Sequence, residues 1–133
     1  INLKVTNWTI LKILESCKKI KKKKIKLLIV GLAYKKDIND ERESPAIKIL
    51  KKLSKKKFFT IKYINPYIPH FFLNKKKLSS INLTNTELMK NDIVIITTDH
   101  SGINFKKIRK YAKQIIDTRG VYKGIKDTKI IHA

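Results

Sequence analysis

The sequence predicts an α/β fold: an open parallel sheet with helices on both faces, preceded by one helix. Short, nearly continuous aliphatic runs such as Ile25–Val30 and residues 92–97 suit strands that are buried on both faces of a sheet. Segments with helical periodicity alternate with these runs, which is typical of βαβ units. A length of 133 residues with 42% hydrophobic content makes a single core feasible.

The first predicted helix covers residues 3–20. Its apolar positions recur at the i, i+3, i+4, i+7 spacing of one helical face, at Ile10, Ile13, Leu14, Cys17 and Ile20. Cys17 lies on that stripe with no activating base near it in sequence, so we interpret it as a core residue rather than a nucleophile. A single cysteine excludes an internal disulfide and fits a reducing compartment, from which we expect a cytoplasmic protein.

The later predicted helices have recognisable start signals. Pro45 follows Ser44 at a first helical position, where its missing N–H costs nothing, and the Ser44 hydroxyl can cap the helix. The predicted helices and their candidate caps are 44–56 with Ser44, 85–90 with Thr84 or Asn85, and 104–111 with Asp99 or Ser101.

Five strands alternate with these helices. They are predicted at residues 25–30, 58–64, 92–97, 114–116 and 129–131. Right-handed crossovers make the sheet parallel, and all connections are expected to be free of hairpins, so the loops that follow the strands share one edge, where ligands of open α/β sheets bind. Six polar side chains are therefore expected to converge at that edge: Lys35, Arg42, Tyr67, Asp99, His100 and Arg119.

The charge is strongly basic, with a formal net value of +22 at pH 7. Three of the 32 basic residues are arginines, whereas arginine usually supplies the bidentate contacts of a nucleic-acid binder. AT-rich coding explains the abundance of lysine, isoleucine and asparagine at least as well as a functional basic surface does. A basic nucleic-acid-binding module stays an alternative, although no aromatic residues interleave the lysine runs.

Several site motifs are absent from the sequence. Gly31 is followed by Leu32, so the turn after the first strand has no GxGxxG or GxxxxGK[ST] motif. No CxxC or HxxxH spacing suggests a metal site. Asp99-His100-Ser101 has the residue types of a hydrolytic triad, but adjacent side chains diverge, so no catalytic residue is predicted. No stretch reaches the roughly 20 apolar residues of a membrane span, and residues 1–20 lack the apolar core of a signal peptide.

Two functional questions remain open from the residues alone. In the loop after Gly31, Lys35 and Arg42 either bind phosphate oxygens or only pair with neighbouring acids such as Asp37 on the surface. Arg119, which follows an apolar strand, is either a salt-bridge partner or a ligand clamp.

Four blocks in this order resemble the UDP-binding domain of the UDP-glucose/GDP-mannose dehydrogenase family. They are GLAYKKDINDERESPA (31–46), NPYIP (65–69), TTDHS (97–101) and DTRGVY (117–122). They are most similar to the UDP-N-acetylglucosamine and UDP-N-acetylmannosamine 6-dehydrogenases. One departure is Asn65, where the family usually has aspartate. The resemblance implies a Rossmann-like nucleotide-sugar-binding domain at residues 23–133, and residues 1–22 would be the end of the central dimerisation helix.

The resemblance also implies roles for particular residues. Tyr34 and Lys35 would contact the substrate, Arg119 would hold its nucleotide portion, and Arg42 would reach the pyrophosphate of NAD. Family members oxidise the C6 hydroxyl of a nucleotide sugar to a carboxylate with two NAD molecules and a cysteine, and they dimerise. The expected partner is a UDP-sugar, most similar to a UDP-N-acetylhexosamine, rather than nucleic acid or a membrane.

The family's NAD-binding motif and catalytic-cysteine segment have no counterpart in this sequence. The sequence also begins with Ile1, and Met89 is its only methionine. We therefore expect a fragment whose start lies upstream and which is inactive alone. The competing hypothesis is a non-catalytic truncated remnant that still folds and binds UDP.

Overall fold

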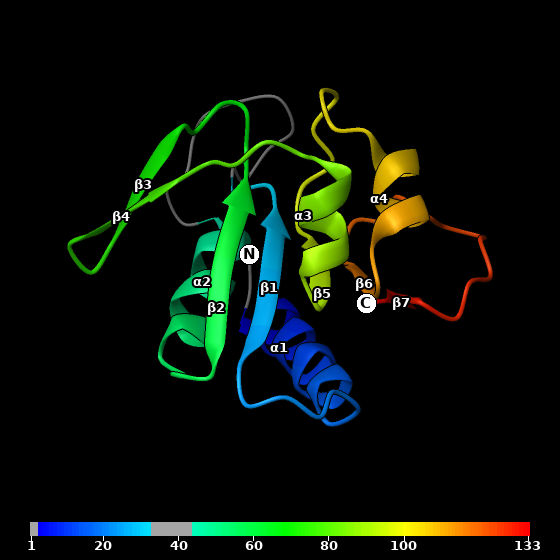
Figure 1. Cartoon of the computed structure of the whole chain (residues 1–133), viewed down its shortest axis with the longest axis horizontal. Helices are drawn as coiled ribbons and strands as arrows, with labels where there is room; N and C mark the ends of the chain where they lie inside the picture. The colour runs from blue at the N-terminus through cyan, green and yellow to red at the C-terminus, as the bar shows by residue number, and fades with distance from the viewer. Residues whose placement is uncertain (1–2, 33–43) are drawn as a thin grey trace.

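The computed structural model describes residues 3–32 and 44–133 (Figure 1). The elements in chain order are α1 (Leu3–Cys17), β1 (Ile25–Val30), α2 (Pro45–Ser54), β2 (Phe59–Ile64), β3 (His70–Leu73), β4 (Lys76–Ser79), α3 (Asn85–Lys90), β5 (Ile93–Ile96), α4 (Phe105–Tyr111), β6 (Ile115–Asp117) and β7 (Ile130–His132). The predicted strands and the predicted helices are present, with boundaries that differ by at most three residues. Within the described ranges, no helix has the length and hydropathy needed to cross a bilayer.

Five strands form one sheet in the order β2-β1-β5-β6-β7, and every neighbouring pair is parallel. In the central pair, Leu27 lies opposite Ile93 and Val30 opposite Ile96. The apolar side chains of both strands are buried, as a sheet covered on two faces requires. The predicted open parallel α/β sheet, preceded by one helix, is confirmed.

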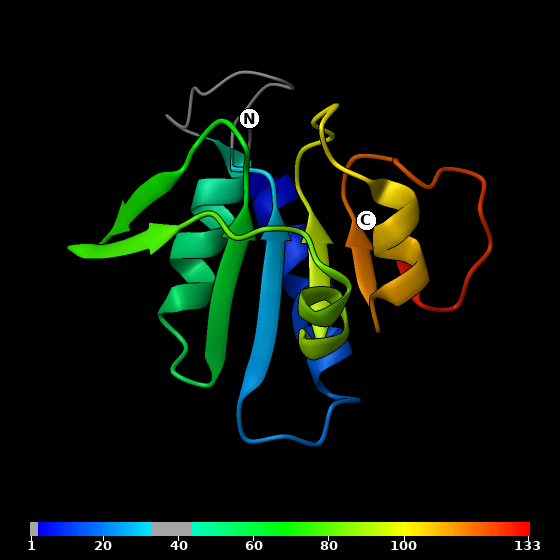
Figure 2. The same ribbon diagram turned by 45° about the horizontal axis from the view of Figure 1, so that its top comes forward.

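The two faces of the sheet have separate cores. Leu27 and Ile29 of β1 point to the face covered by α1 and α2, whereas Leu28 and Val30 point to the face covered by α3 and α4. Figures 1 and 2 show these helix pairs on opposite sides of the sheet. The carboxyl ends of the parallel strands lie at the top of Figure 1. We call this end of the sheet the strand-end edge.

The connection from β2 to β5 contains a β-hairpin that the sequence analysis did not predict. β3 and β4 pair antiparallel, with Phe71 opposite Leu78, and both Asn74 and Lys75 of the turn have positive φ values of 50° and 68°. Such turns usually contain Asn-Gly, and here lysine replaces the glycine, which removes the common sequence signal. The expectation that all connections are free of hairpins was therefore wrong.

The caps of the helices were predicted with mixed success. Ser44 Oγ accepts hydrogen bonds from the N–H groups of Ala46 and Ile47, and Thr84 Oγ1 accepts one from Glu87, as predicted. The cap of α4 is Asn104 itself, whose Oδ1 accepts from the N–H of Lys107. The prediction of Asp99 or Ser101 was wrong because an Asn directly before the helix can already reach its third N–H.

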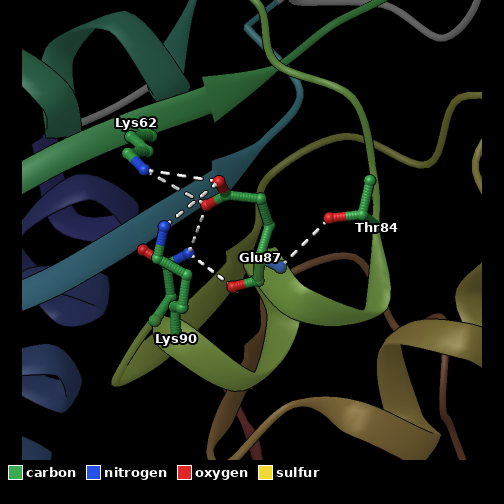
Figure 3. A network of polar contacts seen from close by, with 5 residues as sticks. Lys62, Thr84, Glu87 and Lys90 are labelled. Atoms are coloured by element: carbon green, nitrogen blue, oxygen red, sulfur yellow. Dashed lines mark hydrogen bonds and ion pairs between the residues drawn. The ribbon is translucent and has the colours of Figure 1, made fainter.

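Glu87 ties α3 to the sheet. Its carboxylate lies 3.2 Å from Lys62 Nζ of β2 and 3.8 Å from Lys90 Nζ (Figure 3). Burial disfavours the charged form of Glu87, but the hydrogen bond and charge of Lys62 outweigh it and lower the pKa of this carboxyl group. The ionised carboxylate therefore helps to hold α3 over the sheet.

The buried face of α1 differs from the predicted stripe. Ile13 is fully buried as predicted, but the other most buried side chains are Thr6, Thr9 and Ser16. Ile10, Leu14 and Cys17 are only partly buried. Trp8 and Leu11 are 51% and 53% exposed. The helix therefore presents two large apolar side chains that residues 3–32 and 44–133 leave half exposed.

Candidate functional site

The candidate site is the edge of the sheet at which the parallel strands end. The chain passes from β1 to β2 on one side and then returns to β5 on the other side of β1. This reversal makes the carboxyl ends of β1 and β5 the topological switch point, where open α/β sheets bind ligands. Leu32 follows the end of β1 and Ser44 caps α2, so these two residues flank the undescribed part of the first loop.

The ends of β1 and β5 are joined tightly at Gly31. Thr97 Oγ1 donates hydrogen bonds to the carbonyls of Val30 and Gly31, at 3.0 and 2.6 Å. Gly31 has a φ of +99°, and a Cβ at this position would lie 2.5 Å from Thr98 Cβ. Only glycine fits this conformation and contact, so the backbone at the switch point has a defined shape.

Arg119 follows β6 at the same edge. Its Nε lies 3.9 Å from Asp99 Oδ1, and the two side chains are 46% and 37% exposed. This separation is long for an ion pair, and such exposed pairs contribute about 0–1 kcal/mol. Asp99 also lines a shallow hollow of about 280 Å³ with His100, Ser101, Ile103, Phe105 and Val121. A half-exposed, weakly paired guanidinium can bind an anion in place of Asp99.

The loop that carries Arg119 is held by Asp117, the last residue of β6. Asp117 Oδ1 accepts hydrogen bonds from the N–H groups of Arg119 and Val121, at 3.0 and 3.2 Å, and Oδ2 accepts one from Tyr122 at 2.8 Å. Tyr122 Oη donates to the Phe105 carbonyl at 2.6 Å. Burial, followed by the charge of Asp117, raises the pKa of Tyr122, so its hydroxyl stays protonated and keeps that bond.

The loop after β2 meets the loop after β5 at the same edge. The rings of Tyr67 and His100 lie 5.5 Å apart and are tilted by 57°. Asn65 is buried, and its Oδ1 accepts a hydrogen bond from the N–H of Tyr67 at 3.0 Å. Among the described residues, Asn65 Nδ2 has no hydrogen-bond partner. These contacts place an aromatic pair beside the switch point.

Four of the six side chains expected at this edge are described, and the structure brings them together in two contacts: Tyr67 with His100, and Asp99 with Arg119. The predicted substrate residues Tyr34 and Lys35 and the predicted cofactor residue Arg42 lie outside the described residues. Sequence reasoning also gave no role to Asp117. Its signal was an Asp two residues before Arg119 and three before a glycine, because aspartate commonly accepts hydrogen bonds from backbone N–H groups in such turns.

Nucleophilic or metal chemistry finds no support in the described part of the chain. Burial, with a smaller effect of the Asp92 charge, raises the pKa of the Cys17 thiol to about 11. This cysteine therefore stays protonated, and its side chain packs against the core while only partly buried, rather than lying within the core as the sequence analysis expected. No group of three or more His, Cys, Asp or Glu side chains gathers as metal ligands within residues 3–32 and 44–133.

A larger hollow of about 400 Å³ lies away from this edge, beside the β3–β4 hairpin. It is lined by Ser54, Phe59, Thr60, Ile61, Leu73, Asn74, Lys76 and Leu78. This hollow holds no acid–base pair or anion-binding arginine, and it is not at the switch point. The strand-end edge, by contrast, carries an arginine and an aromatic pair, which suit an anionic, partly aromatic molecule.

Comparison with known protein families gives a match over most of the chain. The model described as "UDP-glucose/GDP-mannose dehydrogenase family, UDP binding domain" matches residues 28–124. The matched range contains Gly31, Asn65, Asp99, Asp117 and Arg119, which are among the described residues at the carboxyl ends of the strands.

Two curated proteins illustrate the similarity. An NDP-N-acetyl-D-galactosaminuronic acid dehydrogenase of Ralstonia solanacearum is 34% identical over 97 residues, which cover 69% of this chain and 22% of the relative. A UDP-N-acetyl-D-mannosamine dehydrogenase of Methanocaldococcus jannaschii is 33% identical over 118 residues, which cover 82% of this chain and 26% of the relative. The chain thus spans roughly a quarter of the length of these relatives.

Solved structures show the same fold. A UDP-D-ManNAc dehydrogenase of Pyrococcus horikoshii superposes with a TM-score of 0.69 at 24% identity, covering 90% of this chain and 28% of that chain. A UDP-N-acetyl-mannosamine dehydrogenase of Staphylococcus aureus gives a TM-score of 0.67 at 22% identity, covering 95% and 29%. These similarities establish the fold of the chain.

Proposed function

The chain belongs to the UDP-glucose/GDP-mannose dehydrogenase family, and from this premise we propose that it binds the nucleotide sugar in an NAD-dependent nucleotide-sugar 6-dehydrogenase. The complete enzyme would oxidise the C6 hydroxyl of the sugar to a carboxylate. Residues 23–133 are the proposed nucleotide-sugar-binding domain, and residues 1–22 are the proposed end of a central dimerisation helix. The observation on which the proposal depends is the position of Arg119 at the carboxyl edge of the sheet, within the matched range.

The proposed roles follow from the charge of the ligand. A nucleotide diphosphate carries negative charge that cations must neutralise when it leaves water. Arg119 would hold the nucleotide portion, Lys35 would neutralise the diphosphate or orient the sugar, and Tyr34 would contact the substrate. The Asp99 pairing of Arg119 supports this proposal, because its 3.9 Å separation leaves the guanidinium able to exchange a carboxylate for a phosphate oxygen.

NAD, which the family uses, does not fit the described edge as its main site. A pyrophosphate that approaches the first turn needs a glycine-rich backbone. Here Gly31 is followed by Leu32, and Thr98 already occupies the space where a Cβ of Gly31 would lie. We therefore assign this domain no step in hydride transfer. Its contribution to cofactor binding would be limited to Arg42, which would reach the NAD pyrophosphate across an interdomain cleft.

The proposed substrate is a UDP-N-acetylhexosamine. The relatives of this chain include enzymes named for N-acetyl-D-mannosamine and N-acetyl-D-galactosaminuronic acid, and these names support an N-acetylated sugar. The resemblance to family members at Tyr34-Lys35-Lys36 and Arg119-Gly120 implies the same class. The single cysteine suits a reducing compartment, and we propose a cytoplasmic location.

Calorimetric titration of the 133-residue chain with UDP, UDP-N-acetylglucosamine and inorganic phosphate tests the proposal. A charge-assisted hydrogen bond contributes about 1.5–3 kcal/mol, so Arg119→Ala should weaken UDP binding about tenfold to hundredfold. Lys35→Ala combined with Arg119→Ala should remove measurable binding. Equal heats for this double variant and the unaltered chain would exclude the proposed site.

Arg109 offers a matched control for that experiment. It is an arginine of similar exposure, 42%, and its Nε also pairs with an aspartate, Asp127, at 3.1 Å. Arg109→Ala removes the same charge from another part of the fold, so UDP affinity should stay within about twofold. Affinity for DNA that falls steeply with salt, without preference for UDP, would instead support the basic nucleic-acid-binding alternative.

We also propose that α1 mediates a homodimer in the complete protein. The exposed Trp8 and Leu11 form an apolar face, and Lys12 Nζ lies 4.5 Å from the centre of the Trp8 ring. Sedimentation measurements should show less dimer when Trp8 and Leu11 are both changed to alanine. Phe72→Ala, at a 65% exposed position on β3, is the control and should leave association unchanged.

A further inference from the structure

Asp117 is a buried carboxylate that accepts hydrogen bonds from backbone N–H groups. It is 1% exposed, and no lysine or arginine side chain in the described parts of the chain forms an ion pair with it. Burying an ionised carboxylate is costly unless hydrogen bonds compensate for the lost water. At Asp117 this compensation comes from three backbone N–H groups, those of Arg119, Val121 and Tyr122. The Asp117 carboxylate therefore binds the backbone of the loop that follows it.

Further contacts fix both ends of this loop. Thr118 Oγ1 donates a hydrogen bond to the Ile96 carbonyl of β5 at 2.7 Å, and its N–H donates to the same carbonyl at 3.1 Å. At the other end, the Tyr122 hydroxyl is bound to the Phe105 carbonyl. Between these anchors Gly120 has a φ of +70°, a left-handed conformation that favours glycine. The backbone of residues 117–122 is thus held against β5 and α4.

The side chain of Arg119 contrasts with this fixed backbone. It is 46% exposed, and its ion pair with Asp99 is 3.9 Å long. The fixed backbone orients Arg119, while its weakly paired guanidinium keeps hydrogen-bond donors that a ligand can use. This is the arrangement that an anion-binding group needs, because the cost of ordering the loop is met before the ligand arrives.

We propose that Asp117 is a positioning residue for nucleotide-sugar binding: its carboxylate orders residues 118–122 so that Arg119 faces the diphosphate of the ligand. This inference depends on the proposed function, since it gives Arg119 an anionic ligand. It assigns Asp117 no contact with the ligand. Its effect on affinity therefore has to act through Arg119.

Asp117→Asn tests this role in the 133-residue chain, with UDP as the probe. Asparagine keeps one acceptor oxygen and places an NH₂ group where the second oxygen accepted a backbone N–H, so at least one of the three bonds is lost. We expect UDP affinity to fall about tenfold or more, as misplaced binding groups typically cause. Electrostatics alone predicts the opposite, because the variant removes a negative charge near an anion site. Unchanged or tighter UDP binding would therefore overturn the inference.

A double-mutant cycle separates positioning from general damage. In the Arg119→Ala background, Asp117→Asn should weaken UDP binding by no more than about twofold, because the group that it positions is gone. An equal loss in both backgrounds would show that Asp117 acts independently of Arg119. If Arg119→Ala alone leaves the affinity unchanged, the proposed function fails instead. The two ideas are therefore tested separately.

A pair of glycine variants covers the case in which Asp117→Asn does not fold. Gly120 and Gly124 have φ values of +70° and +83°, and a Cβ at either position meets no atom within 4 Å. Alanine at either position therefore introduces similar backbone strain without a clash. Gly120→Ala, next to Arg119, should weaken UDP binding several-fold more than Gly124→Ala. Equal affinities for the two variants would contradict a role for the loop conformation.

Discussion

Gly31→Ala is the most direct test of the packing at the switch point. A residue with φ near +99° is strained by a Cβ, at a cost of about 1–2 kcal/mol. The added Cβ would also lie 2.5 Å from Thr98 Cβ and 2.8 Å from Thr98 Oγ1. Relieving such overpacking typically costs a further ~1–3 kcal/mol. The expected loss in the free energy of unfolding is therefore about 2–5 kcal/mol, with the larger part coming from the contact.

Urea unfolding followed by circular dichroism measures this loss, and Gly124→Ala separates its two parts. Gly124 has a similar φ of +83° but open space where a Cβ would lie, so its alanine variant should lose only about 1–2 kcal/mol. The difference between the two variants, about 1–3 kcal/mol, reports the contact with Thr98. If both variants lose the same stability, the ends of β1 and β5 do not approach each other as described, and the argument for a fixed switch point fails.

Three further predictions concern stability and reactivity. Ser44→Ala removes the acceptor for two buried N–H groups of α2 and should lower the free energy of unfolding in urea by about 1 kcal/mol. The control, Ser54→Ala, removes only an exposed donor and should lower it by less than half as much. Burial opposes the charged form of Glu87, but the hydrogen bond and charge of Lys62 and the charge of Lys90 lower its pKa below the ordinary value of 4.5, so the stabilising contribution of its carboxylate is present above pH 4.5 and is lost as the pH falls through the lowered pKa. Glu87→Gln should accordingly be less stable than the unaltered chain at pH 7, and urea titrations at successively lower pH should find this difference shrinking. Burial, then the charge of Asp92, raises the pKa of Cys17 to about 11, so at pH 8 a thiol reagent should modify the folded chain far more slowly than the urea-unfolded chain, and equal rates would contradict this.

The position of the candidate site could be predicted from the sequence, but its contacts could not. Parallel strands end at one edge whatever side chains they have, so the sequence alone predicts Asp99 and Arg119 at that edge. Which group each one meets depends on the path of its loop. The role of Asp117 is an example: a carboxylate that binds three N–H groups two to five residues later is visible only when the turn has been built. The contact between Lys35 and the substrate, which the resemblance implies, stays a prediction.

The sequence by itself determined the helices, the five parallel strands, their order along the chain and the family, because these depend on local periodicity, start signals such as Ser44-Pro45 and contiguous motifs. Tertiary structure decided which strands are neighbours, the β3–β4 hairpin, the hydroxyl-lined buried face of α1 and the pairing of Arg119 with Asp99. The physical reason is the range of the interactions. A cap or an aliphatic strand is set by residues a few positions apart, whereas burial and pairing at the strand ends depend on residues that are brought together only when the sheet forms.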